Sequence, residues 1–208
     1  MVDAHPYSKL TPDMVLAAVE TIGFEPDARI FALNSYENRV YQVGLHSGGS
    51  IVVKFYRPDR WTEEQILEEH RFAQELMDLE IPVIAPLQIN GSSTLTVFED
   101  FQLAAFPLFV GRAPELDNLD NLLVMGRFVA RIHAVGAMTN FLERAELSID
   151  RFAVQSREFL LSNNFIPEDL TAAYDSLSAD LISRIEKRFS EHGQLTMLRI
   201  HGDCHPGN

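Results

Sequence analysis

The spacing of apolar residues changes its period near residue 107, and this change constrains the fold more than any other feature of the chain. Before that point, short segments rich in β-branched and aromatic residues indicate strands. These segments are 28–33, 40–45, 51–56, 94–99 and 102–106. A long helix interrupts them, beginning at Thr62-Glu63-Glu64 and ending near Leu79, with apolar residues along one face. The first half is therefore predicted to be β-rich with one long helix.

After residue 107 the apolar residues recur every three or four positions, which is typical of amphipathic helices. Such helices are predicted at 119–135, near 149–161 and at 167–191. The segment 107–114 contains two prolines and a glycine and is the best candidate for a hinge. We therefore predict an α+β fold of two lobes, with a β-rich N-terminal lobe at 1–107 and a helical C-terminal lobe at 108–208.

Composition argues against several classes of partner. The formal net charge of −13 disfavours binding to nucleic acid or to an anionic membrane, because both depend on clustered Lys and Arg. Cys204 is the single cysteine, so no internal disulfide can form. The N-terminal residues lack the regions of a signal peptide, and no apolar run is long enough to span a bilayer. We expect a cytoplasmic, monomeric protein that binds neither nucleic acid nor membrane.

The C-terminal sequence His201-Gly202-Asp203-Cys204-His205-Pro206-Gly207-Asn208 has the residue types and spacing of a kinase catalytic loop. In such a loop the Asp receives or orients the proton of the acceptor hydroxyl, and an Asn five positions later holds Mg²⁺ on ATP. We assign these roles to Asp203 and Asn208. The preceding residues Leu198-Arg199-Ile200 are predicted to form a short apolar strand that holds the loop rigidly.

Other chemistry at this loop is less well supported by the sequence. A zinc site formed by His201, Asp203 and His205 has no further His or Cys cluster to complete its ligand shell. The sequence gives no independent reason for a lowered pKa of the Cys204 thiol, so we interpret Cys204 as a buried spacer and not as a nucleophile.

Lys54 lies within the apolar segment 51–56, where its side chain shares a strand face with Val52 and Tyr56. A cation in such a strand is costly unless an anion compensates it. Lys54 is either an edge-strand residue that reaches solvent or a lysine that contacts the phosphates of ATP. The catalytic-loop motif favours the second interpretation.

A phosphate-binding lysine of this kind pairs with a carboxylate on a neighbouring helix. Glu69 lies on the same helical stripe as Ile66 and Leu76 and would face the sheet. Glu68 is rotated by about 100° toward a polar flank. We therefore predict that Glu69 pairs with Lys54, although either glutamate could instead be a solvated surface acid.

The sequence contains no Gly-rich phosphate loop between its first two predicted strands. The polar segment 34–39 takes that place, and the Ser35 hydroxyl with neighbouring backbone N–H groups could contact the phosphates. The alternative interpretation is an ordinary polar hairpin turn.

Four segments together resemble the aminoglycoside phosphotransferase and choline kinase-like superfamily, and within it a group of bacterial stress-response kinases. These segments are 33–41, 53–58, 61–70 and the loop 201–208. The resemblance implies a protein kinase-like fold, with Asp203 as proton acceptor, Asn208 as a Mg²⁺ ligand, and Ser35, Lys54 and Glu69 at the ATP site. In this superfamily a second metal-binding Asp follows the loop, beyond Asn208.

Loop and resemblance together predict ATP-dependent, Mg²⁺-assisted phosphorylation of serine or threonine hydroxyls on protein substrates, in a bacterial stress response. One alternative is a small-molecule kinase that acts on a homoserine, choline or aminoglycoside-like hydroxyl, since every hydroxyl acceptor needs the same Asp. Another is an inactive fragment that binds ATP, because the second metal-binding Asp is missing.

Overall fold

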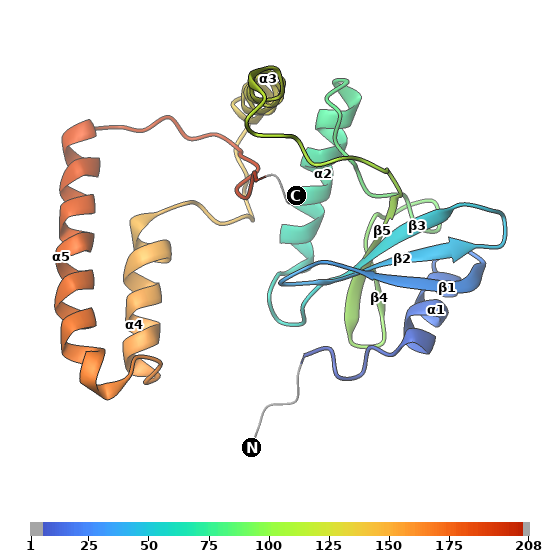
Figure 1. The fold of residues 1–208 in the computed structure, drawn as a ribbon, viewed down its shortest axis with the longest axis horizontal. Helices are drawn as coiled ribbons and strands as arrows, with labels where there is room; N and C mark the ends of the chain where they lie inside the picture. The colour runs from blue at the N-terminus through green and yellow to red at the C-terminus, as the bar shows by residue number, and fades with distance from the viewer. Residues whose placement is uncertain (1–5, 206–208) are drawn as a thin grey trace. The chain divides into compact units, whose positions relative to one another are not determined.

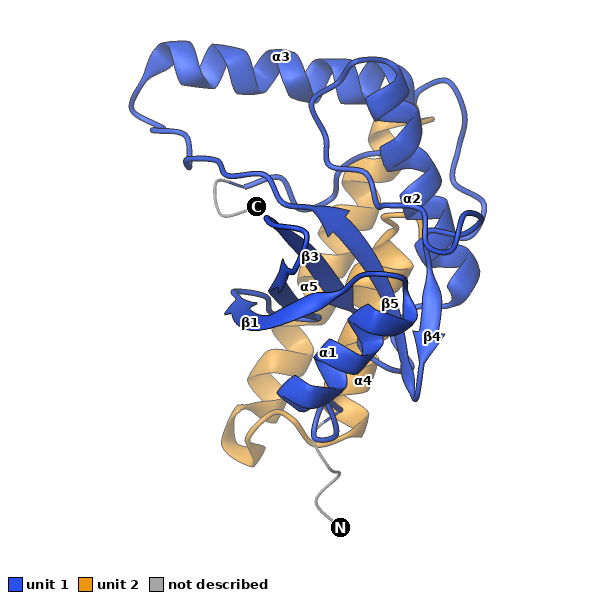
Figure 2. Ribbon diagram, turned by 90° about the vertical axis from the view of Figure 1, so that its right-hand side faces the viewer, with its two compact units in different colours: residues 1–144, 198–208 blue, residues 145–197 orange. Residues whose placement is uncertain are grey.

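The computed structural model describes residues 6–205, which form two compact units (Figure 2). The first unit comprises the described residues up to Arg144 together with those from Leu198 onward, and the second comprises Ala145–Met197. This division differs from the lobe boundary near residue 107, which stays a prediction. Among the described residues no helix is both long and apolar enough to cross a membrane.

An antiparallel sheet of five strands forms the centre of the first unit (Figure 1). Its strands lie in the order β1 (Pro26–Leu33), β2 (Arg39–Leu45), β3 (Ser50–Phe55), β5 (Phe101–Pro107) and β4 (Thr96–Phe98). The helices of this unit are α1 (Pro12–Thr21), α2 (Glu63–Asp78) and α3 (Leu119–Gly136). β3 is an interior strand, because it pairs with β2 on one side and with β5 on the other.

Different helices cover the two faces of the sheet. α1 packs on a buried core that includes Val53 of β3, whereas α2 contributes Ile66 to a second cluster that includes Ala104 of β5. Ala104 is the register partner of Lys54. Since side chains alternate along a strand, Lys54 and Ala104 lie on the face toward α2.

The start of α2 is fixed by a capping box. Gln65 N donates to Thr62 Oγ1 at 3.3 Å, and Thr62 N donates to the Gln65 side chain at 3.1 Å. These two bonds satisfy donors that a helix N-terminus leaves unpaired. The helix therefore begins where the sequence predicted it.

Two strands depart by two residues from their predicted bounds: β4 (Thr96–Phe98) is shorter than the predicted 94–99, and β1 is longer than predicted. β1 begins at Pro26, two residues before the predicted start, and a bulge interrupts its register between Pro26 and Ile30. Within the bulge Ala28 has a φ of 69°, which breaks the alternation that marks a strand in the sequence.

The second unit is helical, as predicted. It contains a π-helical turn η1 (Asp150–Val154), which leads directly into α4 (Gln155–Ser162), and the long helix α5 (Glu168–His192). Arg157 joins the two helices, since its guanidinium pairs with Asp175 and donates to Ser178 Oγ.

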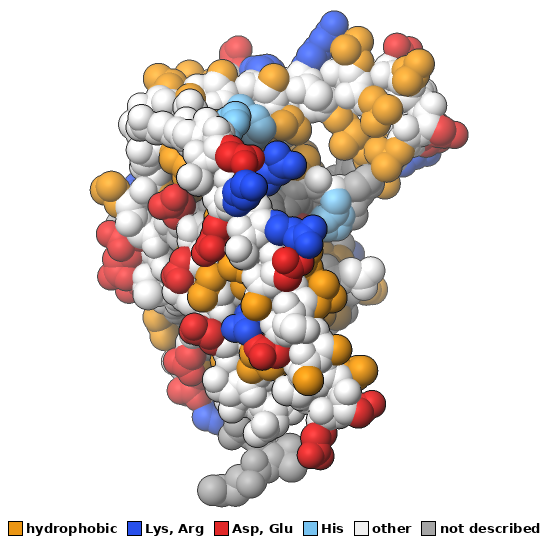
Figure 3. All heavy atoms as spheres, turned by 90° about the vertical axis from the view of Figure 1, so that its left-hand side faces the viewer, with side chains coloured by type: hydrophobic (Ala, Val, Ile, Leu, Met, Phe, Trp, Pro, Cys, Tyr) orange, Lys and Arg blue, Asp and Glu red, His pale blue; other side chains and the backbone are white. Residues whose placement is uncertain are grey.

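Acidic side chains are spread over the face drawn in Figure 3, in keeping with the net charge of −13.

Candidate active site

Lys54 lies at the centre of the candidate site, on interior strand β3. Its Nζ lies 3.4 Å from Glu69 Oε1 and 4.5 Å from the centre of the Tyr56 ring. The alternative of an edge-strand lysine is therefore wrong, because β3 has hydrogen-bonded neighbours on both sides. The structure brings Lys54 and Glu69 together, and their role toward a nucleotide stays a prediction.

Glu69 also contacts a second cation, which the sequence did not predict. Arg144 Nη1 lies 2.9 Å from Glu69 Oε2, so one carboxylate holds Lys54 with one oxygen and Arg144 with the other. The guanidinium of Arg144 stacks on the Trp61 ring at 4.3 Å. This arrangement gathers positive charge at one point of an acidic protein, as a site for a polyanion requires.

The expectation that Glu68 faces a polar flank is wrong. Glu68 is buried, and its carboxylate accepts three backbone hydrogen bonds. Their donors are Leu142 N at 2.6 Å, Glu143 N at 2.9 Å and Arg144 N at 2.7 Å. Burial opposes ionisation of Glu68, but these donors and the charge of Arg71 together hold the pKa of its carboxyl below its usual range. Glu68 therefore fixes the segment that carries Arg144 onto α2.

A buried polar chain lies beneath Lys54 and Glu69. His70 Nε2 and Tyr56 Oη are hydrogen-bonded at 2.8 Å, and His70 Nδ1 and Thr94 Oγ1 are hydrogen-bonded at 2.8 Å. Burial, aided by the neighbouring cations, lowers the pKa of His70 from 6.5 to about 4. His70 is consequently neutral near pH 7.

This pKa sets a pH dependence of stability. The unfolded chain binds a proton at His70 near pH 6.5 while the folded chain does so only near pH 4. The free energy of unfolding is therefore expected to fall by on the order of 3 kcal/mol from pH 7 to pH 4. Denaturant titrations of the native protein and of His70→Gln should show the flatter profile for the variant. Parallel profiles over this range would contradict the assignment.

Ser35 is engaged in the turn between β1 and β2. Its hydroxyl donates to the Asn38 carbonyl oxygen at 2.8 Å. The same turn is tied to the connector before α2, because the Glu37 carboxylate accepts from Trp61 Nε1 at 2.6 Å and from Arg60 Nε at 3.1 Å. The bonds of Ser35 are those of a polar hairpin turn, and its contact with ATP phosphates stays a prediction.

The catalytic-loop motif follows Arg199 at the end of the first unit. Asp203 N donates to His201 Nδ1 at 3.3 Å, and His205 Nε2 lies 3.7 Å from Asp203 Oδ1. Cys204 is exposed, so its interpretation as a buried spacer is wrong. Asn208 lies outside the described residues. Within residues 6–205 no three His, Cys, Asp or Glu side chains form a group that could hold a metal ion.

The strand predicted just before the loop is not formed. Residues 198–200 have no regular secondary structure and do not join the sheet, and their two apolar side chains are not buried. The buried residue of the three is Arg199. Arg199 contacts Glu75 of α2 and Val135 of α3. The sequence did not predict these contacts, because the two partners lie 124 and 64 residues away along the chain.

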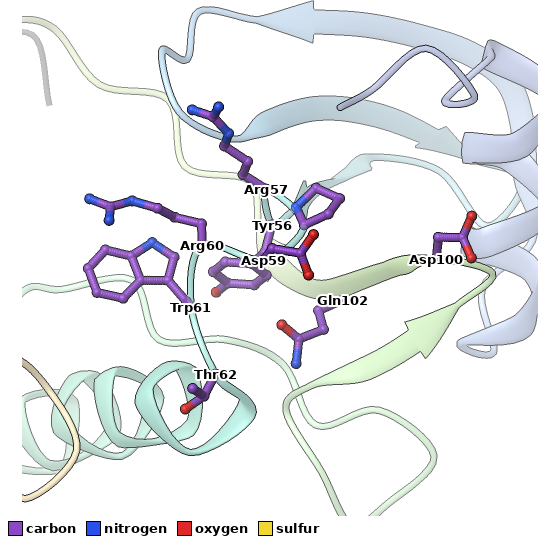
Figure 4. Close-up of a pocket in the computed structure, with 9 residues that line it drawn as sticks. Tyr56, Arg57, Asp59, Arg60, Trp61, Thr62, Asp100 and Gln102 are labelled. Carbon is purple, nitrogen blue, oxygen red and sulfur yellow. The ribbon is translucent and has the colours of Figure 1, made fainter. Parts of the chain in front are cut away.

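A cavity of about 430 Å³ lies beside this site, at the connector between β3 and α2 (Figure 4). It is lined by Tyr56, by residues 57–62, and by Asp100 and Gln102 of the β4–β5 hairpin. Neither Lys54 nor Asp203 lines it. The cavity is therefore separate from the residues predicted to hold the nucleotide.

Comparison with known proteins places the chain in a family. Residues 29–208 match the Phosphotransferase enzyme family, APH. Stress response kinase A of Escherichia coli (strain K12) is 40% identical over 205 residues. Serine/threonine protein kinase RdoA of Salmonella typhimurium is 37% identical over 206 residues. In both comparisons the match covers 99% of this chain and 62% of the relative.

Solved structures confirm the protein kinase-like fold predicted from the sequence. Amicoumacin kinase hAmiN, solved with AMP-PNP, Ca²⁺ and Ami, superimposes with a TM-score of 0.73 at 19% identity, covering 94% of this chain and 59% of that one. The microcompartment-associated aminopropanol kinase superimposes with a TM-score of 0.66 at 16% identity, covering 95% and 64%. At these identities the likeness shows the fold alone. Because the family model matches residues 29–208, which is most of the chain, this chain belongs to the Phosphotransferase enzyme family.

Proposed function

We propose that this chain carries the nucleotide-binding and catalytic-loop residues of a kinase that transfers the γ-phosphoryl group of ATP to serine or threonine hydroxyls of proteins. The observation that carries the proposal is the ion pair between Lys54 on an interior strand and Glu69 on α2. This pairing holds a lysine against the α- and β-phosphates in protein kinases. The names of the curated relatives, a stress response kinase and a serine/threonine protein kinase, support protein substrates.

In the proposed mechanism the residues act mainly by positioning and by neutralising charge. Lys54, held by Glu69, neutralises the phosphates of ATP, and Asp203 orients the acceptor hydroxyl and accepts its proton. Asn208 supplies an amide oxygen, a donor that suits Mg²⁺. When bound, the metal ion would neutralise charge on the β- and γ-phosphates.

A change at Lys54 tests the nucleotide role. Lys54→Met removes the charge but keeps the apolar stem, so kcat/KM for ATP is expected to fall by about 10²- to 10³-fold. Lys187→Met is the matched control, because Lys187 is an exposed lysine that also pairs with a glutamate. Steady-state phosphoryl transfer by both variants of the full-length protein measures the effect. Equal activity of the two variants would refute the role of Lys54.

The acceptor is tested separately. Transfer of ³²P from γ-labelled ATP is measured on bacterial protein extracts and on a panel of amino alcohols, homoserine, choline and aminoglycosides. Label on serine or threonine residues supports the proposal, whereas label on one small hydroxyl compound alone would establish the small-molecule alternative. ATP binding without transfer to any acceptor would favour a binding role only.

A further inference from the structure

Arg199 is a charged side chain buried at the point where the chain enters the catalytic-loop motif. The exposed fraction of Arg199 is 6%, which is smaller than the exposed fractions of the neighbouring apolar residues Leu198 and Ile200. Nη1 donates to Glu75 Oε2 at 2.7 Å, and Nη2 donates to Glu75 Oε1 at 3.1 Å and to the Val135 carbonyl oxygen at 3.1 Å. One guanidinium therefore binds both α2 and the C-terminal end of α3.

Aromatic rings complete the surroundings of this guanidinium. Its Cζ lies 4.2 Å from the centre of the Phe72 ring and 5.8 Å from that of Phe141. The two rings meet edge to face, with centres 5.4 Å apart. Arginine is suited to such a place, because its planar fork can stack on rings while it binds a carboxylate with two parallel bonds.

Burying the Arg199 guanidinium removes its hydration, so its pair with the partly exposed Glu75 contributes little net stability compared with apolar residues of the same volume. It does impose geometry, since the two parallel bonds fix the distance and the angle between the partners. If apolar packing anchored this segment, Ile200 would be buried, but its exposed fraction is 40%. The segment is therefore held by the contacts of Arg199 and not by burial of Ile200.

The backbone of Arg199 is also held closely. Its N–H donates to the Gly136 carbonyl oxygen at 3.1 Å. A Cβ atom at position 136 would overlap the carbonyl oxygen of Arg199, so this approach requires a glycine at the end of α3.

We propose that Arg199 is a positioning residue for Asp203, acting through its pair with Glu75. Asp203 follows Arg199 by four residues, and α2 carries both Glu75 and Glu69, the partner of Lys54. One helix thereby sets the place of the phosphate-binding lysine and of the loop that orients the acceptor. The inference rests on the proposed function, which assigns those roles to Lys54 and Asp203.

The kinetic test uses Arg199→Lys in the full-length protein, which keeps the charge but loses the fork. We expect kcat, corrected for the folded fraction, to fall by about tenfold to a hundredfold, since a misplacement of about 1 Å can cost about 10²-fold. The Kd for ATP measured without Mg²⁺ should stay within about twofold, because the change leaves Lys54 and Glu69 in place and this measurement does not involve Asn208, the proposed Mg²⁺ ligand in the same loop. Arg131→Lys is the matched control, because Arg131 joins α3 to the end of α2 without reaching the loop.

A second variant moves the loop without removing a charge. Gly136→Ala displaces the Arg199 carbonyl and is expected to give the same pattern, a lower kcat with an unchanged Kd. A folded Arg199→Lys protein with native kcat, or one that loses ATP affinity as much as kcat, would overturn the inference.

A third measurement does not depend on turnover. In ¹⁵N-resolved NMR spectra the amide signals of residues 201–205 are expected to shift or broaden in Arg199→Lys and in Gly136→Ala, and to stay in place in Arg131→Lys. Unchanged loop signals would refute the positioning role. A native protein that transfers no phosphoryl group would refute the proposed function instead, and the two failures are thus distinguishable.

Discussion

Asp203→Asn is expected to lower kcat by about 10²- to 10⁴-fold in the full-length protein while leaving the affinity for ATP nearly unchanged. The amide has nearly the shape of the carboxylate but cannot accept the proton of the attacking hydroxyl, and general-base assistance has that magnitude. ATP affinity should persist because the phosphates are assigned to Lys54, which lies on a different element. Initial rates with γ-labelled ATP and calorimetric titration with ATP and Mg²⁺ measure the two quantities.

Asp180→Asn serves as the control for this substitution, since Asp180 is an exposed acid of α5 that pairs with Arg184 within its own helix. It should retain native kcat. A native rate for Asp203→Asn would remove the catalytic assignment of the loop. A loss of ATP affinity that matches the loss of rate would assign Asp203 to nucleotide binding instead.

Local patterns in the sequence were sufficient to predict several parts of this site. The alternation of residues 51–56 placed Lys54 on a defined strand face, and the three- and four-residue spacing of α2 placed Glu69 toward that face. Both predictions depend only on the periods of strand and helix, which act over a few residues. The structure brings Lys54 and Glu69 together for that reason.

Contacts between distant segments could not be read from these patterns. Glu68 has the polar neighbours of a surface acid along the helix, yet its partners lie 74 to 76 residues further on. Arg199 follows a leucine and precedes an isoleucine, which suggested an apolar strand, yet Glu75 is 124 residues away. In both cases a charge is buried because a distant group compensates it, and a single sequence does not record that group.

Glu68→Ala is expected to have the largest effect on stability among the changes considered. The substitution removes the carboxylate acceptor of three part-buried backbone N–H groups, and a hydrogen bond to a charged group contributes about 1.5–3 kcal/mol. Because the released segment 142–144 can partly rehydrate, we expect the free energy of unfolding to fall by about 3–5 kcal/mol. Urea titration monitored by the fluorescence of Trp61, the single tryptophan, measures this loss.

The pH dependence separates the ionic contribution of Glu68 from its packing. In the folded protein the pKa of Glu68 lies below its ordinary value of 4.5. The contribution of ionised Glu68 to the free energy of unfolding is therefore fully present above pH 4.5, and it is lost as the pH falls through the pKa of the folded protein. The difference in unfolding free energy between the native protein and Glu68→Ala should therefore narrow below about pH 4.5. Glu63→Ala, an exposed acid in the first turn of the same helix, should cost less than about 1 kcal/mol. Amide exchange measures where the stability is lost. If Glu68→Ala exchanges faster at residues 142–144 but not in β2 and β3, the loss of unfolding free energy lies at these three bonds. A uniform increase in exchange rate would show instead that Glu68 supports the whole unit.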